Sequence, residues 1–297
     1  MNVKKIIPQG YCHGVLRAIK IARDAVYENK NVYILGSIIH NKFIVKAFED
    51  LGCITLDDSR LNRLELLDKI DSGCVIFTAH GVSPLVYEKA LKKGLKIIDA
   101  TCPDVLSIHK KYKNHLNMGY TCLYIGKRNH PEVEGVLGIS KDIILIESID
   151  DLLNLSGDKF YISNQTTLSE DDVKFIYDKA LSTLPNVIID NERCNATTAR
   201  QNALKNNDSD LCIIIGDKKS SNTKKLFEVS SKYVKTIMIE NVLEIDYNIL
   251  LKVDNVSISA GASTPKEIIN DCHNYLLQFD KNNPSTYENR SISKIIL

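Results

Sequence analysis

Three cysteines share one short sequence pattern that occurs once in each third of the chain. Cys12, Cys102 and Cys194 each stand a few residues after a β-branched run, at residues 5–7, 96–98 and 187–189. Each also stands just before a segment in which apolar residues recur at helical spacing. The pattern predicts a buried strand, a turn, a thiol and a helix, in that order. Because the two intervals between the cysteines are nearly equal, we expect three similar segments.

A pseudo-threefold arrangement of these segments would bring the three thiols together. Structural zinc sites prefer four closed ligands, whereas an iron–sulfur cluster is held by cysteine thiolates and, with only three of them, keeps one iron open to a substrate. Cys12 is expected near a helix N-terminus, which favours the thiolate form. The alternative is that the repeat is accidental and that the three are ordinary core cysteines.

The composition is that of a globular protein in a reducing compartment. The chain has 297 residues, 25% of them charged, and a net charge of +1, which gives no reason to expect nucleic acid or an anionic membrane as a partner. It contains no long uncharged apolar stretch, and we expect a cytoplasmic protein. In that compartment cysteines are rarely paired as disulfides. The five others lie in apolar strand or helix patterns and are predicted core residues: Cys53, Cys74, Cys122, Cys212 and Cys272.

Predicted strands alternate with predicted helices along the whole chain. Helices are expected at residues 43–51, 83–93, 105–118 and from Pro265 to 279. Alternation of this kind indicates the α/β class with parallel sheets. We predict three pseudo-equivalent α/β domains, arranged around a central cluster. Their boundaries are residues 14–101, residues 102–193, and residues 194–280 together with 1–13, followed by a C-terminal tail at 281–297.

Polar residues follow most of the predicted strands. In parallel sheets, ligands bind at the carboxyl ends of the strands, so these residues are expected to converge with the three cysteines on one cavity. Taken singly, each fits a structural role as well: a histidine in a loop, a serine at a helix cap, or a solvated carboxylate. A helix start with hydroxyl groups also suits an anion such as diphosphate. The candidates are His40, His80, His130, Glu132, Thr166, Thr167, Ser220, Ser221, Asn222 and Ser263.

Eight short motifs in this order resemble those of the 4-hydroxy-3-methylbut-2-enyl diphosphate reductases, the LytB/IspH family. The resemblance extends from residue 10 to about residue 279. The motifs are Gly-Tyr-Cys-His-Gly-Val at 10–15, Thr-Ala-His-Gly-Val at 78–82, Asp-Ala-Thr-Cys-Pro at 99–103, His-Pro-Glu-Val-Glu-Gly at 130–135, Gln-Thr-Thr-Leu-Ser at 165–169, Cys-Asn-Ala-Thr-Thr at 194–198, Ser-Ser-Asn at 220–222 and Ala-Gly-Ala-Ser at 260–263.

The resemblance implies an iron–sulfur oxidoreductase of isoprenoid biosynthesis. Such an enzyme takes two electrons and protons, removes the allylic hydroxyl of (E)-4-hydroxy-3-methylbut-2-enyl diphosphate as water, and yields isopentenyl and dimethylallyl diphosphates. This is the last step of the methylerythritol phosphate pathway. The resemblance also implies a [4Fe–4S] cluster whose open iron takes the hydroxyl. A ferredoxin or flavodoxin is the implied electron donor.

The resemblance also assigns roles to the candidate residues. Cys12, Cys102 and Cys194 match the cluster ligands. The diphosphate-holding positions correspond to His40, His80, Ser220, Asn222 and Ser263, with Ser221 beside them. Protons near the substrate hydroxyl are organised at the positions of Glu132, Thr166 and His130, and Thr167 adjoins these.

Two other functions remain open at this point. A cluster-binding redox sensor would bind a diphosphate ligand without turnover, and the absence of Glu132 would favour it, but Glu132 is present. A zinc hydrolase would use the same thiols, and metal analysis together with the lack of visible absorption would distinguish it. Breaking an allylic C–O bond requires electrons and a leaving oxygen that is protonated or bound to a Lewis acid, which an open iron beside a carboxylic acid supplies.

Overall fold

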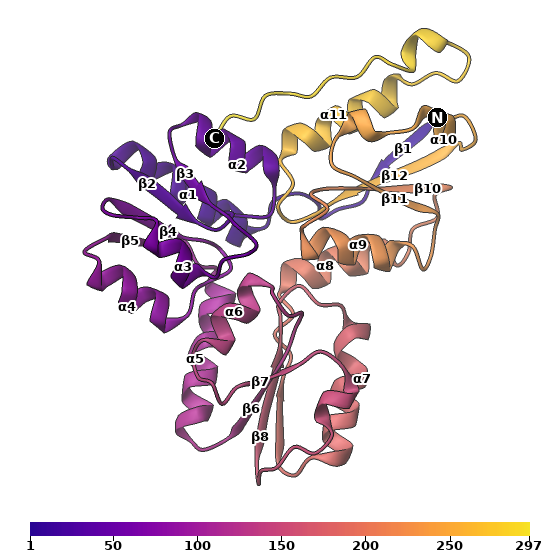
Figure 1. Cartoon of the computed structure of the whole chain (residues 1–297). Coiled ribbons are helices and arrows are strands. Elements are labelled where there is room, and N and C mark those ends of the chain that lie inside the picture. The colour runs from indigo at the N-terminus through magenta and orange to yellow at the C-terminus, as the bar shows by residue number, and fades with distance from the viewer. The chain divides into compact units, whose positions relative to one another are not determined.

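The computed structural model describes all residues from 1 to 297 and contains three four-stranded sheets, each made only of parallel strands (Figure 1). The sheet of the first third has the order β3-β2-β4-β5. Its strands are β2 (Val32–Leu35), β3 (Ile54–Leu56), β4 (Cys74–Phe77) and β5 (Lys96–Asp99). The helices between and around them are α1 (His13–Glu28), α2 (Lys42–Asp50), α3 (Arg63–Asp68) and α4 (Pro84–Lys92).

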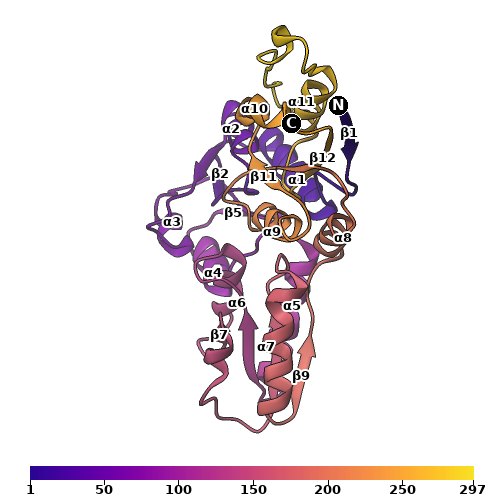
Figure 2. The ribbon, with the colours of Figure 1, turned by 90° about the vertical axis from the view of Figure 1, so that its right-hand side faces the viewer.

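The sheet of the middle third has the order β7-β6-β8-β9. Its strands are β6 (Thr121–Ile125), β7 (Ile144–Ile146), β8 (Phe160–Asn164) and β9 (Val187–Asp190). Helices α5 and α6 cover one face through Ile108, Tyr112 and Val133, whereas α7 packs on the other face through Val173 and Ile176. Figure 2 shows α7 lying along this sheet beside β9. These helices are α5 (Pro103–Asn117), α6 (Pro131–Leu137) and α7 (Glu170–Thr183), and a 3₁₀ turn, η1, spans Ile149–Leu152.

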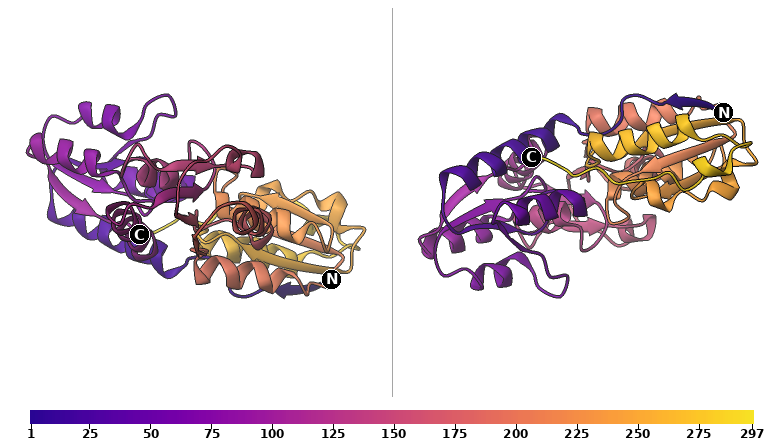
Figure 3. Two further views of the ribbon diagram at one scale, coloured as in Figure 1. Left: turned by 90° about the horizontal axis from the view of Figure 1, so that it is seen from below. Right: turned by 90° about the horizontal axis from the view of Figure 1, so that it is seen from above.

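The third sheet combines the two ends of the chain. Its order is β11-β10-β12-β1, formed by β1 (Asn2–Lys5), β10 (Leu211–Ile215), β11 (Thr236–Ile239) and β12 (Asn255–Ala260). Helix α11 packs on one face, and α8 and α9 pack on the other (Figures 1 and 3). The helices of this part are α8 (Asn195–Leu204), α9 (Ser221–Ser230), α10 (Tyr247–Leu250) and α11 (Lys266–Gln278), with 3₁₀ turns η2 (Val242–Glu244) and η3 (Pro284–Thr286).

The three sheets share one strand order, which explains the sequence repeat. In each sheet the strand that leads to a predicted cluster cysteine lies at one edge: β5, β9 and β1. The strand beside it is β4, β8 or β12, so the N-terminal strand completes the sheet of the last third. The predicted α/β class with three parallel sheets is confirmed. The position of a cluster at their centre stays a prediction.

The residues group into two compact units, each with its own contacts. The first contains Met1–Val15, His40–Ala47 and Asn195–Leu297, and the second contains Leu16–Ile39 and Phe48–Cys194. The third sheet belongs to the first unit, and the other two sheets belong to the second. The three predicted domain boundaries therefore remain a proposal. None of the helices combines the length and the apolar character that crossing a membrane requires.

The first strand ends earlier than the sequence predicts, and the C-terminal tail packs on the first unit. The first strand was expected at residues 5–7, but β1 ends at Lys5, and the side chain of Ile7 is exposed. The Ile6 N–H still donates to the Ile258 carbonyl of β12 at 2.9 Å, and Pro8, which has no N–H, cannot continue the ladder beyond it. At the other end, Tyr287 of the tail stacks on Phe279, with ring centroids 5.1 Å apart, and Ile295 packs against the core of this unit.

Candidate active site

The three predicted ligand cysteines occupy equivalent backbone positions. Cys102 caps α5, and Cys12 and Cys194 directly precede α1 and α8. Each backbone N–H donates a hydrogen bond to a carbonyl in the loop that leaves the neighbouring strand. The acceptors are Ala262 after β12 for Cys12 (3.3 Å), Ala79 after β4 for Cys102 (3.0 Å) and Thr166 after β8 for Cys194 (3.2 Å). The repeat in the sequence is therefore also a repeat in backbone hydrogen bonding.

The exposure of the thiols separates these three cysteines from the rest. None of the eight forms a disulfide, and only Cys12, Cys102 and Cys194 are partly exposed. The other five are buried, as predicted, and burial raises the pKa of Cys53 to about 11 and that of Cys122 to about 12. These two stay protonated at neutral pH and behave as small hydrophobic residues.

The residues present fit an iron–sulfur group in their chemistry. Three accessible thiols, each next to a helix N-terminus, are suitable thiolate donors. Cys12 belongs to the first unit, and Cys102 and Cys194 belong to the second. No three His, Cys, Asp or Glu side chains lie close enough together to hold a metal ion. The ligand assignment therefore stays a prediction.

Glu132 is the most unusual acid of the second unit, because it is buried without a cationic partner. Its side chain is 2% exposed at the start of α6. One carboxylate oxygen accepts from the Thr166 N–H (2.9 Å) and the Tyr124 hydroxyl (3.0 Å), and the other accepts from the Thr166 hydroxyl (2.9 Å). Burial raises the pKa of Glu132, and the hydrogen bonds from Thr166 and Tyr124 oppose that rise only in part. A larger fraction of Glu132 is therefore protonated at neutral pH than of an ordinary glutamate.

His130 and His80 face each other in the same unit. The Nδ1 atom of His130 accepts the Glu132 N–H at 3.1 Å, so in its neutral form the ring carries its proton on Nε2. The rings of His80 and His130 meet edge to face, with centroids 5.8 Å apart, and His80 Nδ1 lies 3.3 Å from the Thr78 hydroxyl. Thr167 is half-buried, and its hydroxyl accepts from the Gln165 side chain at 3.0 Å.

Arg63 is a residue of this region that the sequence patterns did not single out. Its guanidinium is buried and donates to the Gly81 carbonyl (3.1 Å) and the Pro131 carbonyl (3.2 Å). It thereby joins the loop that carries His80 to the loop that carries His130. Burial lowers its pKa, but an arginine stays charged at neutral pH. An arginine in a short amphipathic helix gives no signal of this role, because its two acceptors lie in loops distant along the chain.

The candidates of the first unit surround the start of α9. Ser220 caps this helix and accepts from the Thr223 N–H at 3.3 Å. The Asn222 side chain accepts from the Ala262 N–H at 3.0 Å, and the Ser263 hydroxyl donates to the His40 carbonyl at 2.9 Å. Ser220, Asn222 and Ser263 are buried, whereas His40 and Ser221 are partly exposed. The structure thus links His40, Ser263 and the Asn222 turn within one unit, where a helix N-terminus favours anions.

The chain is similar over nearly its whole length to proteins named 4-hydroxy-3-methylbut-2-enyl diphosphate reductase. The sequence profile of the family described as "LytB protein" matches residues 3–277. The 4-hydroxy-3-methylbut-2-enyl diphosphate reductase of Geobacillus kaustophilus (strain HTA426) is 45% identical over 298 aligned positions, which cover 97% of this chain and 94% of that protein.

Two solved structures are also similar. One is the E-1-hydroxy-2-methyl-but-2-enyl-4-diphosphate reductase from Plasmodium falciparum, with a TM-score of 0.86, 30% sequence identity, and coverage of 100% of this chain and 95% of that one. The other is described as (E)-4-hydroxy-3-methyl-but-2-enyl diphosphate reductase, the terminal enzyme of the non-mevalonate pathway. Its TM-score is 0.69 and its sequence identity 33%, over 94% of this chain and 100% of that one. Since both the profile and a relative 45% identical cover nearly the whole chain, this chain belongs to the LytB family.

Proposed function

We propose that this chain reduces (E)-4-hydroxy-3-methylbut-2-enyl diphosphate to isopentenyl and dimethylallyl diphosphates, the last step of the methylerythritol phosphate pathway. It is an oxidoreductase: one substrate takes up two electrons and two protons and releases one water. The observation that carries this function is the full-length relationship to enzymes named for this reaction, at 45% identity. The buried acid Glu132 supports turnover rather than sensing, because a ligand sensor needs no proton donor.

Membership of the LytB family implies an iron–sulfur cofactor. We infer that it is one [4Fe–4S] cluster, held by Cys12, Cys102 and Cys194. The equivalent backbone hydrogen bonds of the three cysteines and their partial exposure support this choice of ligands. When bound, the cluster supplies electrons and a Lewis-acidic iron for the allylic oxygen. The remaining five cysteines, all buried, are left as packing residues.

The diphosphate is proposed to bind at the start of α9 and at the loops that carry His40 and His80. The supporting features are the N-terminus of α9, with the Asn222 amide in its first turn, and the Ser263 hydroxyl in the loop after β12, all in the first unit. Neutral donors of this kind hold an anion without trapping it as strongly as several cations would. The proposed substrate-binding residues are His40, His80, His130, Thr166, Thr167, Ser220, Ser221, Asn222 and Ser263.

Replacing Asn222 with alanine should weaken substrate binding by roughly one to two orders of magnitude. A hydrogen bond to a charged group is worth about 1.5–3 kcal/mol, and alanine removes the amide that would donate it. The cluster should stay intact, because Asn222 is not one of the residues proposed to bind it. Isothermal calorimetry with the allylic diphosphate measures the affinity. Unchanged affinity in both Asn222→Ala and His40→Ala would remove this binding site.

Proton delivery is proposed for Glu132, with Thr166 and His130 as its catalytic partners. The Thr166 hydroxyl and N–H both hold the Glu132 carboxylate, and His130 accepts the Glu132 backbone N–H. A general acid must carry a proton at the working pH, and burial provides this by raising the pKa of Glu132. The structure thereby supports Glu132 as the acid that lets the hydroxyl leave as water.

The raised pKa of Glu132 also predicts a pH dependence of stability. Between the unfolded pKa of a glutamate, about 4.3, and the raised folded pKa, the folded chain keeps a proton that the unfolded chain loses. Stability therefore falls as the pH rises through this window. Glutamine does not titrate, so the thermal midpoint of Glu132→Gln relative to the parent should rise with pH above about 4.3. Thermal unfolding at several pH values under anaerobic conditions measures the difference, and a difference that stays constant would contradict the raised pKa.

Electrons must come from a redox partner, and a ferredoxin or flavodoxin is proposed. We also propose a cytoplasmic location, and we expect neither nucleic acid nor a membrane as partner. Anaerobic purification with iron and sulfide assays, followed by a reduction assay on the allylic diphosphate, tests the function. The expected result is a brown protein that contains iron and sulfide and turns the substrate over. A colourless zinc protein would point to a hydrolase, and a cluster without turnover would point to a sensor.

A further inference from the structure

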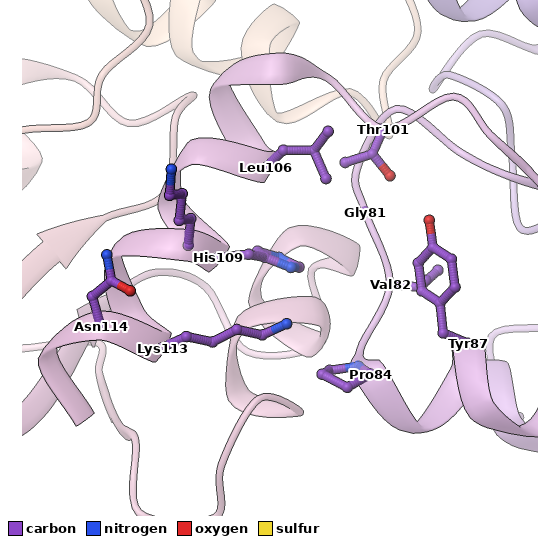
Figure 4. Close-up of a pocket in the computed structure, with 10 residues that line it drawn as sticks. Gly81, Val82, Pro84, Tyr87, Thr101, Leu106, His109, Lys113 and Asn114 are labelled. Carbon is purple, nitrogen blue, oxygen red and sulfur yellow. The ribbon is translucent and has the colours of Figure 1, made fainter. Parts of the chain in front are cut away.

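A hollow of about 300 Å³ opens beside α5 in the second unit (Figure 4). One wall is formed by Val82, Pro84 and Tyr87, and Leu106 and Lys113 of α5 stand opposite. No aspartate or glutamate lines it. The hollow therefore has apolar side chains on two walls and positive charge at its α5 rim.

The positive charge at the rim is not neutralised by the protein. Lys110 and Lys113 are exposed, and neither forms an ion pair. Lys111, on the same helix, contrasts with them because it bonds Asp190 at 2.7 Å and Glu192 at 2.5 Å. Lys110 and Lys113 are therefore available to form ion pairs with carboxylates of another molecule, whereas Lys111 is not.

The interior of the hollow suits a side chain rather than an ion. Leu106 is 42% exposed there, and the Tyr87 ring lines the opposite wall. His109 is buried at its base, and its Nε2 atom has no hydrogen-bond partner. Burial and the charge of Lys113 lower the pKa of His109 to about 4, so the imidazole is neutral at pH 7. An apolar hollow rimmed by cations resembles the centre of a protein interface, where an anchor side chain enters and charges pair around it.

The position of the hollow on α5 connects it to the proposed cluster. Cys102 caps this helix, and Leu106, Lys110 and Lys113 follow it at spacings of four, four and three residues, which places them along one face. At 1.5 Å per residue, Lys110 lies about 12 Å along the helix axis from Cys102. The hollow thus extends from Thr101, the neighbour of the proposed ligand Cys102, to Lys110 and Lys113 along α5.

We propose that this hollow and its lysine rim dock the acidic electron-carrier protein that reduces the enzyme. Carboxylates of the carrier pair with Lys110 and Lys113, and an apolar side chain of the carrier packs against Leu106 and Tyr87. The inference rests on the proposed function, in which each substrate takes up two electrons and two protons and yields one diphosphate product and one water. A one-electron carrier is then oxidised twice per turnover.

The test measures binding directly on the cluster-loaded enzyme. Isothermal calorimetry at low salt is performed with a purified acidic ferredoxin, and with a flavodoxin in parallel. Lys110→Glu/Lys113→Glu should weaken binding by about tenfold or more, because like charges then face each other. The matched control is Lys141→Glu/Lys174→Glu, which changes the net charge equally at two exposed, unpaired lysines elsewhere in the second unit. Equal loss in both double variants, or no binding of either carrier to the parent, would overturn the proposal.

Measuring turnover with a chemical reductant and with reduced ferredoxin distinguishes an effect on carrier docking from an effect on the reaction itself. With dithionite and methyl viologen, which need no docking site, the Lys110→Glu/Lys113→Glu variant should turn over at the parental rate. With reduced ferredoxin its rate should fall about tenfold at low salt, and the gap should narrow as salt screens the charges. An equal fall with the chemical reductant would show that the lysines serve the active site and would overturn the docking proposal. A parent enzyme without turnover under the chemical reductant would instead disprove the proposed function.

Discussion

Replacing Glu132 with glutamine should lower turnover by about 10²-fold or more, while cluster content and substrate affinity stay near the parental values. Glutamine has nearly the same size, and its amide oxygen can still accept from the Thr166 N–H and the Tyr124 hydroxyl. Its amide nitrogen would face the Thr166 hydroxyl, which can accept a hydrogen bond as well as donate one. The substitution therefore removes the transferable proton and little else.

The matched control is Glu134→Gln on the same helix. Glu134 is exposed, accepts the Arg63 backbone N–H at 3.2 Å and lies 3.8 Å from the Arg63 guanidinium, but it does not contact the donors that hold the Glu132 carboxylate. Its variant should turn over within about twofold of the parent. Spectroscopy must first show that cluster and substrate are both bound in Glu132→Gln. If that loaded variant reacts at the parental rate in a single turnover, Glu132 is not the acid, and His130 or the substrate's own diphosphate becomes the leading candidate.

Replacing Cys102 with serine should abolish cluster assembly or turnover. A serine hydroxyl is a poor ligand for iron compared with a thiolate, and the proposed site has only three protein ligands to begin with. Iron and sulfide per chain, measured after anaerobic reconstitution, should fall to near background. Cys12→Ser and Cys194→Ser should behave alike, because the three cysteines have equivalent backbone settings.

The control for this prediction is a buried cysteine of the same sheet region. Cys74→Ser places a hydroxyl in the core of the first-third sheet and should cost about 1–3 kcal/mol of stability while leaving iron near normal. Cys122→Ser and Cys212→Ser should likewise lower stability while leaving the iron content near normal. A Cys102→Ser variant with full iron, sulfide and activity would show that the ligand assignment is wrong.

The α/β class could be predicted because strand and helix periods alternate along the whole chain. The buried strand β4, with Cys74 to Phe77 all inaccessible, is the clearest case. The closing of the last sheet by β1 could be anticipated only from the cysteine repeat, since Asn2–Lys5 is itself polar and exposed. Local propensity carries no information on such a pairing, because Val3 and its partner Val256 lie at opposite ends of the chain.

The candidate site could be predicted residue by residue, but its local chemistry could not. The motifs identify Glu132, whereas its raised pKa depends on burial, opposed in part by donors from β6 and from the loop after β8, which only the fold brings to it. Arg63 was missed for the same reason, since its acceptors at Gly81 and Pro131 are contributed by loops of two different sheets. The unpaired lysines beside the hollow cannot be distinguished from the paired Lys111 by sequence alone.

The most direct measurement of the central claim is a single turnover with counted electrons. The anaerobic, cluster-loaded enzyme is mixed with (E)-4-hydroxy-3-methylbut-2-enyl diphosphate and titrated with a chemical reductant, and the products are identified by mass spectrometry. The proposed reaction predicts two electrons consumed for each product, and isopentenyl and dimethylallyl diphosphates that each lack one oxygen of the substrate. Recovery of unchanged substrate, or release of phosphate with no electrons consumed, would contradict it.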